Sequence, residues 1–139
     1  NDSCGECSSC IKVQKIMHPD LHFSFPIQLS QTNKITISDD VIDLFIDMIA
    51  ETPFFSKEQW GEKMGNKNKQ GVIGTKESHS IIKKLALKPY EGGPKILLMW
   101  LPEDMNQQAA NKLLKLISFN FLNINIAKKK TTKRSSIYL

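Results

Sequence analysis

Apolar residues recur along this chain in two spacings, which predict two strands and several helices. Residues 21–27 place Phe23, Phe25 and Ile27 at alternate positions, which predicts a strand that ends near Pro26 because proline has no amide donor. Residues 95–101 form an unbroken apolar run between two prolines, which is typical of a central strand buried on both faces. We therefore expect a sheet in which the second of these strands is internal.

Apolar positions three and four residues apart predict the helices. Ser38 is a predicted N-cap that is followed by two aspartates in the first turn, and this helix stops at Thr52-Pro53. Ser56 and Gln59 have the spacing of a capping box and open a second helix that ends near Gly65. Three more helices are predicted at residues 11–17, with Ser8 or Ser9 as cap, at residues 77–87, and in a segment that carries Ala110, Leu113, Leu114 and Ile117.

The end of the chain differs in character from the rest. Strand 95–101, the acidic turn 102–106 and the helix after it form an α/β unit. After Ile117 the sequence is dominated by Asn, Ile, Lys and Phe, as in an unselected translation of AT-rich DNA. We predict that residues 118–139 are an aberrant or disordered basic tail, although their apolar alternation would also allow a strand.

Composition and charge restrict the function classes. With 139 residues, 40% hydrophobic and 24% charged, the chain suits one globular domain. No apolar run approaches the roughly 20 residues of a membrane-spanning helix, so no membrane association is expected. The net charge is +5, but five of the 19 basic residues follow residue 117, and residues 1–117 hold 14 bases and 14 acids. The body of the chain is therefore not expected to bind nucleic acid through its charge.

Three cysteines form the clearest chemical motif. Cys4, Cys7 and Cys10 are spaced so that a tight loop can bring their sulfurs to about 2.3 Å from one zinc ion. Tetrahedral zinc takes four ligands, so the fourth would be His18, His22, a water or a residue upstream. A redox Cys-x2-Cys pair or unpaired surface thiols are the alternatives. We predict structural zinc as the cofactor.

Catalytic and nucleotide-binding motifs are absent from the sequence. No Gly-x4-Gly-Lys-Ser/Thr phosphate loop occurs, and strand 95–101 ends in Trp100-Leu101, neither of which can hold a metal ion. We therefore predict no catalytic residue and no bound nucleotide. The remaining polar and aromatic residues have structural interpretations. These are turn or surface histidines (His18, His22, His79), a solvated acidic helix face (Asp39, Asp40, Asp43, Asp47, Glu51) and core tryptophans (Trp60, Trp100).

Two motifs in the same order resemble one protein family. Residues 95–117 resemble the Walker B strand and helix of bacterial clamp-loader ATPase-fold subunits, where an apolar strand precedes Asp-Glu-Ala-x-x-Met and Ala-x-Asn-x-Leu-Leu-Lys. The matching residues are Met105, Ala110, Asn111, Leu113, Leu114 and Lys115. Residues 3–10 with His18-Pro-Asp20 are similar to the zinc module of that family. Because its Asp-Glu pair falls on Trp100-Leu101, the resemblance is to the catalytically silent delta prime family of DNA polymerase III, nearest its Bacteroidetes members.

The resemblance implies both a fold and a function. The fold is a partial three-layer P-loop NTPase (AAA+) fold over residues 1–117, with a parallel sheet and an N-terminal zinc-binding loop in residues 1–20. The family's zinc site is Cys-x8-Cys-x2-Cys-x2-Cys, and Cys4, Cys7 and Cys10 match its last three ligands, so we expect the chain to be a fragment. The function is that of a non-catalytic part of the cytoplasmic clamp loader, which loads the sliding clamp onto primed DNA together with delta and gamma or tau subunits.

Two other functions remain open from the sequence. An ATP-hydrolysing subunit of the gamma or tau type would need a carboxylate near residue 100 and a phosphate loop before Asn1. A small zinc-binding nucleic-acid module would need the basic residues 118–139 to be part of the fold.

Overall fold

The computed structural model describes residues 3–119 and 124–127. Its elements are α1 (Ser8–Gln14), β1 (Leu21–Ser24), the 3-10 helix η1 (Ser38–Val41), α2 (Ile42–Glu51), α3 (Lys57–Lys63), α4 (Thr75–Ala86), β2 (Lys95–Met99), the 3-10 helix η2 (Pro102–Asp104), α5 (Gln107–Phe119) and β3 (Ile124–Ala127). None of the helices in these ranges has the length and apolar character needed to cross a bilayer.

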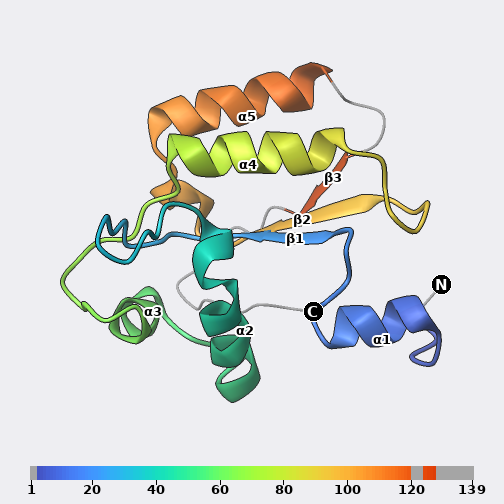
Figure 1. Cartoon of the computed structure of the whole chain (residues 1–139), viewed down its shortest axis with the longest axis horizontal. Coiled ribbons are helices and arrows are strands. Elements are labelled where there is room, and N and C mark those ends of the chain that lie inside the picture. Colours follow the sequence, from blue (N-terminus) through green and yellow to red (C-terminus); the bar gives the residue numbers. More distant parts are fainter. Residues whose placement is uncertain (1–2, 120–123, 128–139) are drawn as a thin grey trace.

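A parallel sheet with the strand order β1-β2-β3 runs through the described chain. Leu21 faces Ile96 across the first pair of strands, and Lys95 faces Ile124 across the second. Figure 1 shows α4 and α5 side by side over one face of the sheet and α2 on the opposite side. The prediction of a parallel sheet with an internal second strand is confirmed, although β2 ends at Met99 and β1 at Ser24, so both strands are shorter than the predicted residues 95–101 and 21–27.

Two hydrophobic cores lie on opposite faces of β2. Leu97 and Met99 face the smaller core with Ile81 of α4 and Leu113 of α5. Leu98 and Trp100 pack against the larger core, which is aromatic. Its buried members are Phe23, Phe25, Ile27, Phe45, Met48, Ile49, Phe55 and Trp60. Alternate side chains of one strand therefore enter both cores, as expected of a strand between two layers of helices.

Burial of β2 is less complete than predicted. Ile96 retains 38% of its surface exposed, although the neighbouring Leu97 is 1% exposed. Ile96 lies on the same face of the strand as Leu98, two residues nearer the start of β2. The prediction of burial on both faces is therefore wrong for Ile96.

The helix predicted to begin at Ser38 starts differently from the expectation. Ser38 is not its cap, because it is the first residue of η1 and the N-cap position falls on Ile37. The Ser38 amide and hydroxyl donate to the Glu77 carboxylate of α4, at 2.7 and 2.5 Å. The capping function falls to Asp40, whose carboxylate accepts the amides of Thr36 and Ile37. The 3-10 helix η1 directly precedes α2, so the α-helix itself begins only at Ile42. This buried Ser38–Glu77 contact joins η1 to α4 and was not predicted.

The boundaries of α3 and α4 follow the sequence closely, whereas α1 spans Ser8–Gln14 instead of the predicted residues 11–17. The capping box before α3 is confirmed, with Ser56 and Gln59 exchanging backbone-to-side-chain hydrogen bonds. Gly65 follows α3 at a positive φ of 97°, which glycine adopts without steric strain. α4 begins at Thr75, two residues before the predicted start.

The inward face of α5 is rotated relative to the prediction. Ala109 and Leu113 are buried, whereas Leu114 is 61% exposed. Ala109 and Leu113 are one turn apart, so they face α4 and the sheet together, while Leu114 points about 100° away around the helix. Leu114 is therefore not a core residue of this fold.

β3 lies within the segment predicted to be a disordered or poorly packed tail. Its backbone pairs with β2 in parallel, with Ile126 opposite Leu97. For these four residues the structure has a strand instead of disorder. Residues 120–123 and 128–139 lie outside the described residues, so the prediction for the tail as a whole stays a prediction.

Candidate metal centre

The three cysteines converge at the start of α1. Their sulfur atoms all lie within 4.8 Å of one another, and the Sγ atoms of Cys4 and Cys10 are 3.7 Å apart. Cys4 and Cys7 are exposed and Cys10 is partly exposed, so an ion can reach the cluster from solvent. In the described part of the chain this is the one group of three potential ligands brought together in this way.

Local backbone geometry brings the sulfurs together. Gly5 has a φ of 72°, which lets the chain turn sharply after Cys4. The side chain of Cys7 caps α1, in place of the predicted Ser8 or Ser9, by accepting the amide of Cys10 at 3.5 Å. The Cys7 amide points in turn at the Cys4 sulfur at 3.3 Å. The same contact, from a backbone amide to the cysteine sulfur three residues earlier, therefore occurs twice in succession.

These contacts shift the pKa values of two of the thiols in opposite directions. The Cys7 amide, followed by that of Glu6, lowers the pKa of Cys4 to about 7. The pKa of Cys10 is raised, chiefly by its hydrogen bond with the Cys7 side chain. One thiol of the cluster is therefore substantially ionised at neutral pH. A thiolate is the form that binds metal ions.

The cluster fits a tetrahedral zinc ion in size and in donor type. Zinc–sulfur bonds of about 2.3 Å at tetrahedral angles separate neighbouring sulfurs by about 3.8 Å. The Cys4–Cys10 separation of 3.7 Å is close to that value. Soft sulfur ligands select zinc, copper(I) and iron–sulfur clusters over magnesium or calcium. Three close cysteines can thus hold a metal ion, with a fourth ligand still required.

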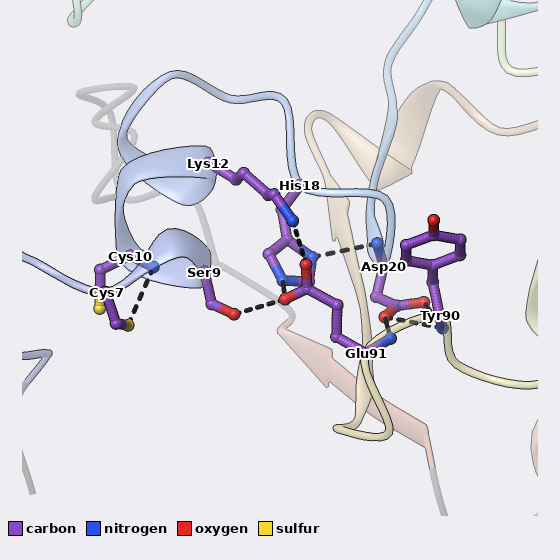
Figure 2. Close-up of polar contacts among 8 residues, drawn as sticks. All are labelled: Cys7, Ser9, Cys10, Lys12, His18, Asp20, Tyr90 and Glu91. Carbon is purple, nitrogen blue, oxygen red and sulfur yellow. Dashed lines mark hydrogen bonds and ion pairs between the residues drawn. The ribbon is translucent and has the colours of Figure 1, made fainter.

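His18 does not supply that ligand in this arrangement. Its Nε2 lies 3.0 Å from Glu91 Oε2, and its Nδ1 accepts the amide of Asp20 at 3.1 Å, so both ring nitrogens have partners. Figure 2 shows the imidazole directed at Glu91, with Cys7 and Cys10 to the other side of Ser9. The prediction that His18 caps a turn is confirmed.

The other two histidines also lie apart from the sulfur cluster. His22 belongs to β1, where burial, followed by the charges of Lys84 and Lys95, lowers its pKa. Its Nε2 is buried without a hydrogen-bond partner among the described residues. His79 on α4 contacts Lys112 Nζ of α5 at 2.6 Å. Neither belongs to the metal-ligand group.

Glu91 is the one residue beside the cluster that sequence reasoning missed. It lies in the turn between α4 and β2, far from the cysteines in sequence, and its carboxylate contacts Ser9 and Lys12 of α1 as well as His18. The Lys12 contact, followed by that of Ser9, lowers the pKa of Glu91 to about 2. Its one signal in the sequence is that it is the only acidic residue between Lys88 and Pro94.

The end of the central strand carries no carboxylate. The ring of Trp100 lies 4.8 Å from that of Phe55 and 5.9 Å from that of Phe45, and Leu101 is buried with a positive φ of 52°. Asp104, three residues beyond Leu101, pairs with Lys57 at 2.6 Å. Trp60 and Trp100 pack in or against the aromatic core, as predicted.

The acidic residues of η1 and α2 do not form a site. All five predicted members of the solvated face are exposed. Two of them are paired with lysines of other helices, since Asp39 contacts Lys84 and Glu51 contacts Lys63. The interpretation of this face as solvated is confirmed.

Comparison with known proteins agrees with these features. No curated protein matches the chain. The family model described as "DNA polymerase III, delta subunit" matches residues 1–118, a range that includes the cysteine cluster, both strands of the β1–β2 pair and nearly all of α5. The match covers most of the 139 residues. The chain therefore belongs to the DNA polymerase III delta subunit family.

Proposed function

We propose that this chain is part of a non-catalytic, delta prime-type subunit of the DNA polymerase III clamp loader, which acts in DNA replication. The observation that carries the proposal is the end of β2, where the partly buried Trp100 and the buried Leu101 stand at the positions that the resemblance assigns to the Asp-Glu pair of ATP-hydrolysing relatives. Without a carboxylate there, the strand can neither hold Mg²⁺ nor activate water. The family match over residues 1–118 supports the same assignment.

The proposed fold is that of a partial AAA+ domain over residues 1–117, with a zinc loop in residues 1–20. Parallel strands with helices on both faces, seen in β1, β2 and their flanking helices, support it. Of residues 118–139, those outside α5 and β3 are proposed to be an aberrant or disordered basic tail.

The proposed partners follow from this role. The chain acts with delta and gamma or tau subunits in the cytoplasm, and it reaches the sliding clamp and primer-template DNA through that assembly. It binds no nucleotide itself. Its contribution is then rigidity, which the aromatic core on one face of the sheet and the α4–α5 layer on the other supply.

Reconstitution with partner subunits tests this function. We expect the chain to co-elute from a size-exclusion column with delta and gamma or tau subunits, and to release no phosphate from ATP when alone. Phosphate release by the purified chain that is abolished by chelating Mg²⁺ would contradict the proposal and favour the gamma or tau type. Failure to co-elute with any of these subunits would remove the clamp-loader role.

We also propose that Cys4, Cys7 and Cys10 hold a structural zinc ion. When bound, the ion would link the loop before α1 to the first turn of that helix. Each residue has a defined part: Cys7 caps α1, Cys4 receives the Cys7 amide, and Cys10 lies within the helix. The fourth position is left for a water or a ligand from outside the described residues.

Competition with a chromogenic zinc chelator tests the metal site. We expect the chain to bind one zinc ion and Cys7→Ala to lose it, since two thiols are a poor set for zinc. Ser8→Ala, a change at the next exposed position, is the matched control and should bind as the unmodified chain does. Equal zinc binding by Cys7→Ala would contradict this ligand set. Formation of a disulfide with no zinc uptake would favour the redox interpretation.

A further inference from the structure

We propose that Glu91 is a positioning residue of the metal centre, because it holds α1 against the turn before β2 and thereby couples metal binding to the order of that turn. This inference rests on the proposed zinc site. It concerns a residue far from the cysteines in sequence, in a turn that carries none of the ligands. Figure 2 shows how the contacts converge on one carboxylate.

α1 cannot maintain its position by packing. It has seven residues, none of them buried, and its apolar side chains Ile11 and Val13 are 40% and 41% exposed. An isolated helix shorter than about 12 residues is marginal in water. The helix that carries Cys10 and is capped by Cys7 therefore depends on other contacts to stay formed and in place.

The polar contacts of α1 with the rest of the fold meet at a single group. Among the described residues, both side-chain hydrogen bonds that join α1 to other elements end on the Glu91 carboxylate, from Ser9 and from Lys12. Ser9 and Lys12 are three residues apart and so share one face of the helix. Ser9 directly precedes Cys10. His18, just after α1, adds a third contact at 3.0 Å.

Glu91 is itself fixed from the other side. The buried carboxylate of Asp20 accepts the amide of Glu91 at 3.1 Å and that of Tyr90 at 2.9 and 3.0 Å. The backbone carbonyl of Asp20 accepts the amide of Ile96, the second residue of β2, at 2.8 Å. A short series of hydrogen bonds therefore leads from the metal-binding helix through Glu91 and Asp20 to the central strand.

The consequence is reciprocal. Loss of the Glu91 carboxylate frees α1, so that Cys7 and Cys10 must be ordered by the metal ion itself and the affinity for zinc falls. Loss of zinc frays α1, which removes the partners of Glu91 and loosens the turn 88–94. Residues hydrogen-bonded directly to metal ligands typically contribute about 10- to 100-fold to metal affinity. Glu91 acts one step further out, through Ser9 and Lys12, so we expect an effect at the lower end of that range.

The test compares zinc affinity, by chelator competition, among single variants of the whole chain. We expect Glu91→Ala to bind zinc about 10-fold more weakly than the unmodified chain, and Glu91→Gln, which keeps one acceptor oxygen, to fall between them. Glu62→Gln is the matched control, because Glu62 also pairs with a lysine, Lys67, but on α3. It should leave the affinity unchanged.

Amide hydrogen exchange distinguishes coupling to the metal from a purely structural role, because a purely structural role of Glu91 would not make exchange in its turn depend on zinc. Addition of zinc to the unmodified chain should slow exchange in residues 8–14 and also at the amides of Tyr90 and Glu91. In Glu91→Ala zinc should slow only residues 8–14. If Glu91→Ala proves unfolded, Lys12→Gln removes the same ion pair from an exposed helix position and should weaken zinc binding in the same direction.

The outcomes separate this inference from the metal site itself. If the unmodified chain binds zinc and Glu91→Ala binds it equally tightly, the coupling is overturned while the site stands. Zinc binding that leaves exchange at residues 90 and 91 unchanged overturns it as well. If the unmodified chain binds no zinc, both the site and the coupling fail.

Discussion

Gly71 shows how one residue can connect two distant loops. It lies beside Pro26, where a Cβ atom would come within 2.9 Å of Pro26 Cβ and 3.2 Å of the Pro26 carbonyl carbon. The next residue, Val72, exchanges two backbone hydrogen bonds with Ile27. Pro26 is held from another side by Trp60, whose indole donates to the Pro26 carbonyl oxygen at 2.7 Å. The segment after β1 therefore has little freedom to move away from Gly71.

We predict that Gly71→Ala destabilises the fold by about 1–3 kcal/mol, the range observed when an added methyl group forces the surroundings to shift. Urea unfolding followed by tryptophan fluorescence measures the change. Gly93→Ala is the control, because no atom lies within 4 Å of its added Cβ and its φ is not in the left-handed region. Equal stability of the Gly71→Ala variant and the unmodified chain would show that Pro26 can shift to admit the added methyl group without a cost in folding free energy.

At the scale of elements, Asp20 joins β1 to the turn before β2. Burial by itself would raise the pKa of this carboxyl, but the amides of Tyr90 and Glu91 outweigh it and hold the pKa below its usual value. A carboxylate whose pKa is lowered on folding stabilises the folded state above its unfolded pKa, about 3.9 for aspartate. That stabilisation is lost as the pH falls through the lower, folded value.

Asp20→Asn should therefore be less stable than the unmodified chain at pH 7, by about 1 kcal/mol for each hydrogen bond whose charged acceptor becomes neutral. The difference should shrink as the pH falls below about 4, where the unmodified chain also loses its carboxylate. Unfolding free energies measured from pH 7 to pH 2 test this. Asp47→Asn, an exposed position on α2, is the control. A difference independent of pH would mean that Asp20 acts through its shape instead of its charge.

For the whole molecule, the sequence predicts what local chemistry determines. The strands at residues 21–27 and 95–101, the capping box at Ser56 and the grouping of Cys4, Cys7 and Cys10 all follow from residues close together in the chain. Each depends on a period, a cap or a spacing within a few residues. The internal position of β2 was also predictable, because an uninterrupted apolar run needs cover on both faces.

Contacts between segments far apart in sequence were not predictable in this way. Ser38 has the chemistry of a helix cap, but it lies inside η1, where its amide and hydroxyl donate to the buried Glu77 of α4. Leu114 fits the helical period, but the α4–α5 contact selects the neighbouring face of the helix. Glu91 is the only acidic residue in its turn, but nothing near it in sequence indicates that it contacts α1. In each case the residue's contacts depend on a partner far away in sequence, and the neighbouring residues in the chain do not indicate which partner that is.

The pairing of β1 with β2 also has a consequence for the speed of folding. Leu21 and Ile96 face each other across this pair, although α2, α3 and α4 all lie between them in sequence. Closing so long a loop costs conformational entropy before the β1–β2 hydrogen bonds can stabilise the fold. We therefore expect folding in the slower range, roughly milliseconds to seconds. Helices that form earlier leave the backbone of Ile96–Met99 unpaired meanwhile. The rate-limiting closure is thus also the interval in which two chains can associate through strand edges, so refolding yield should fall as protein concentration rises.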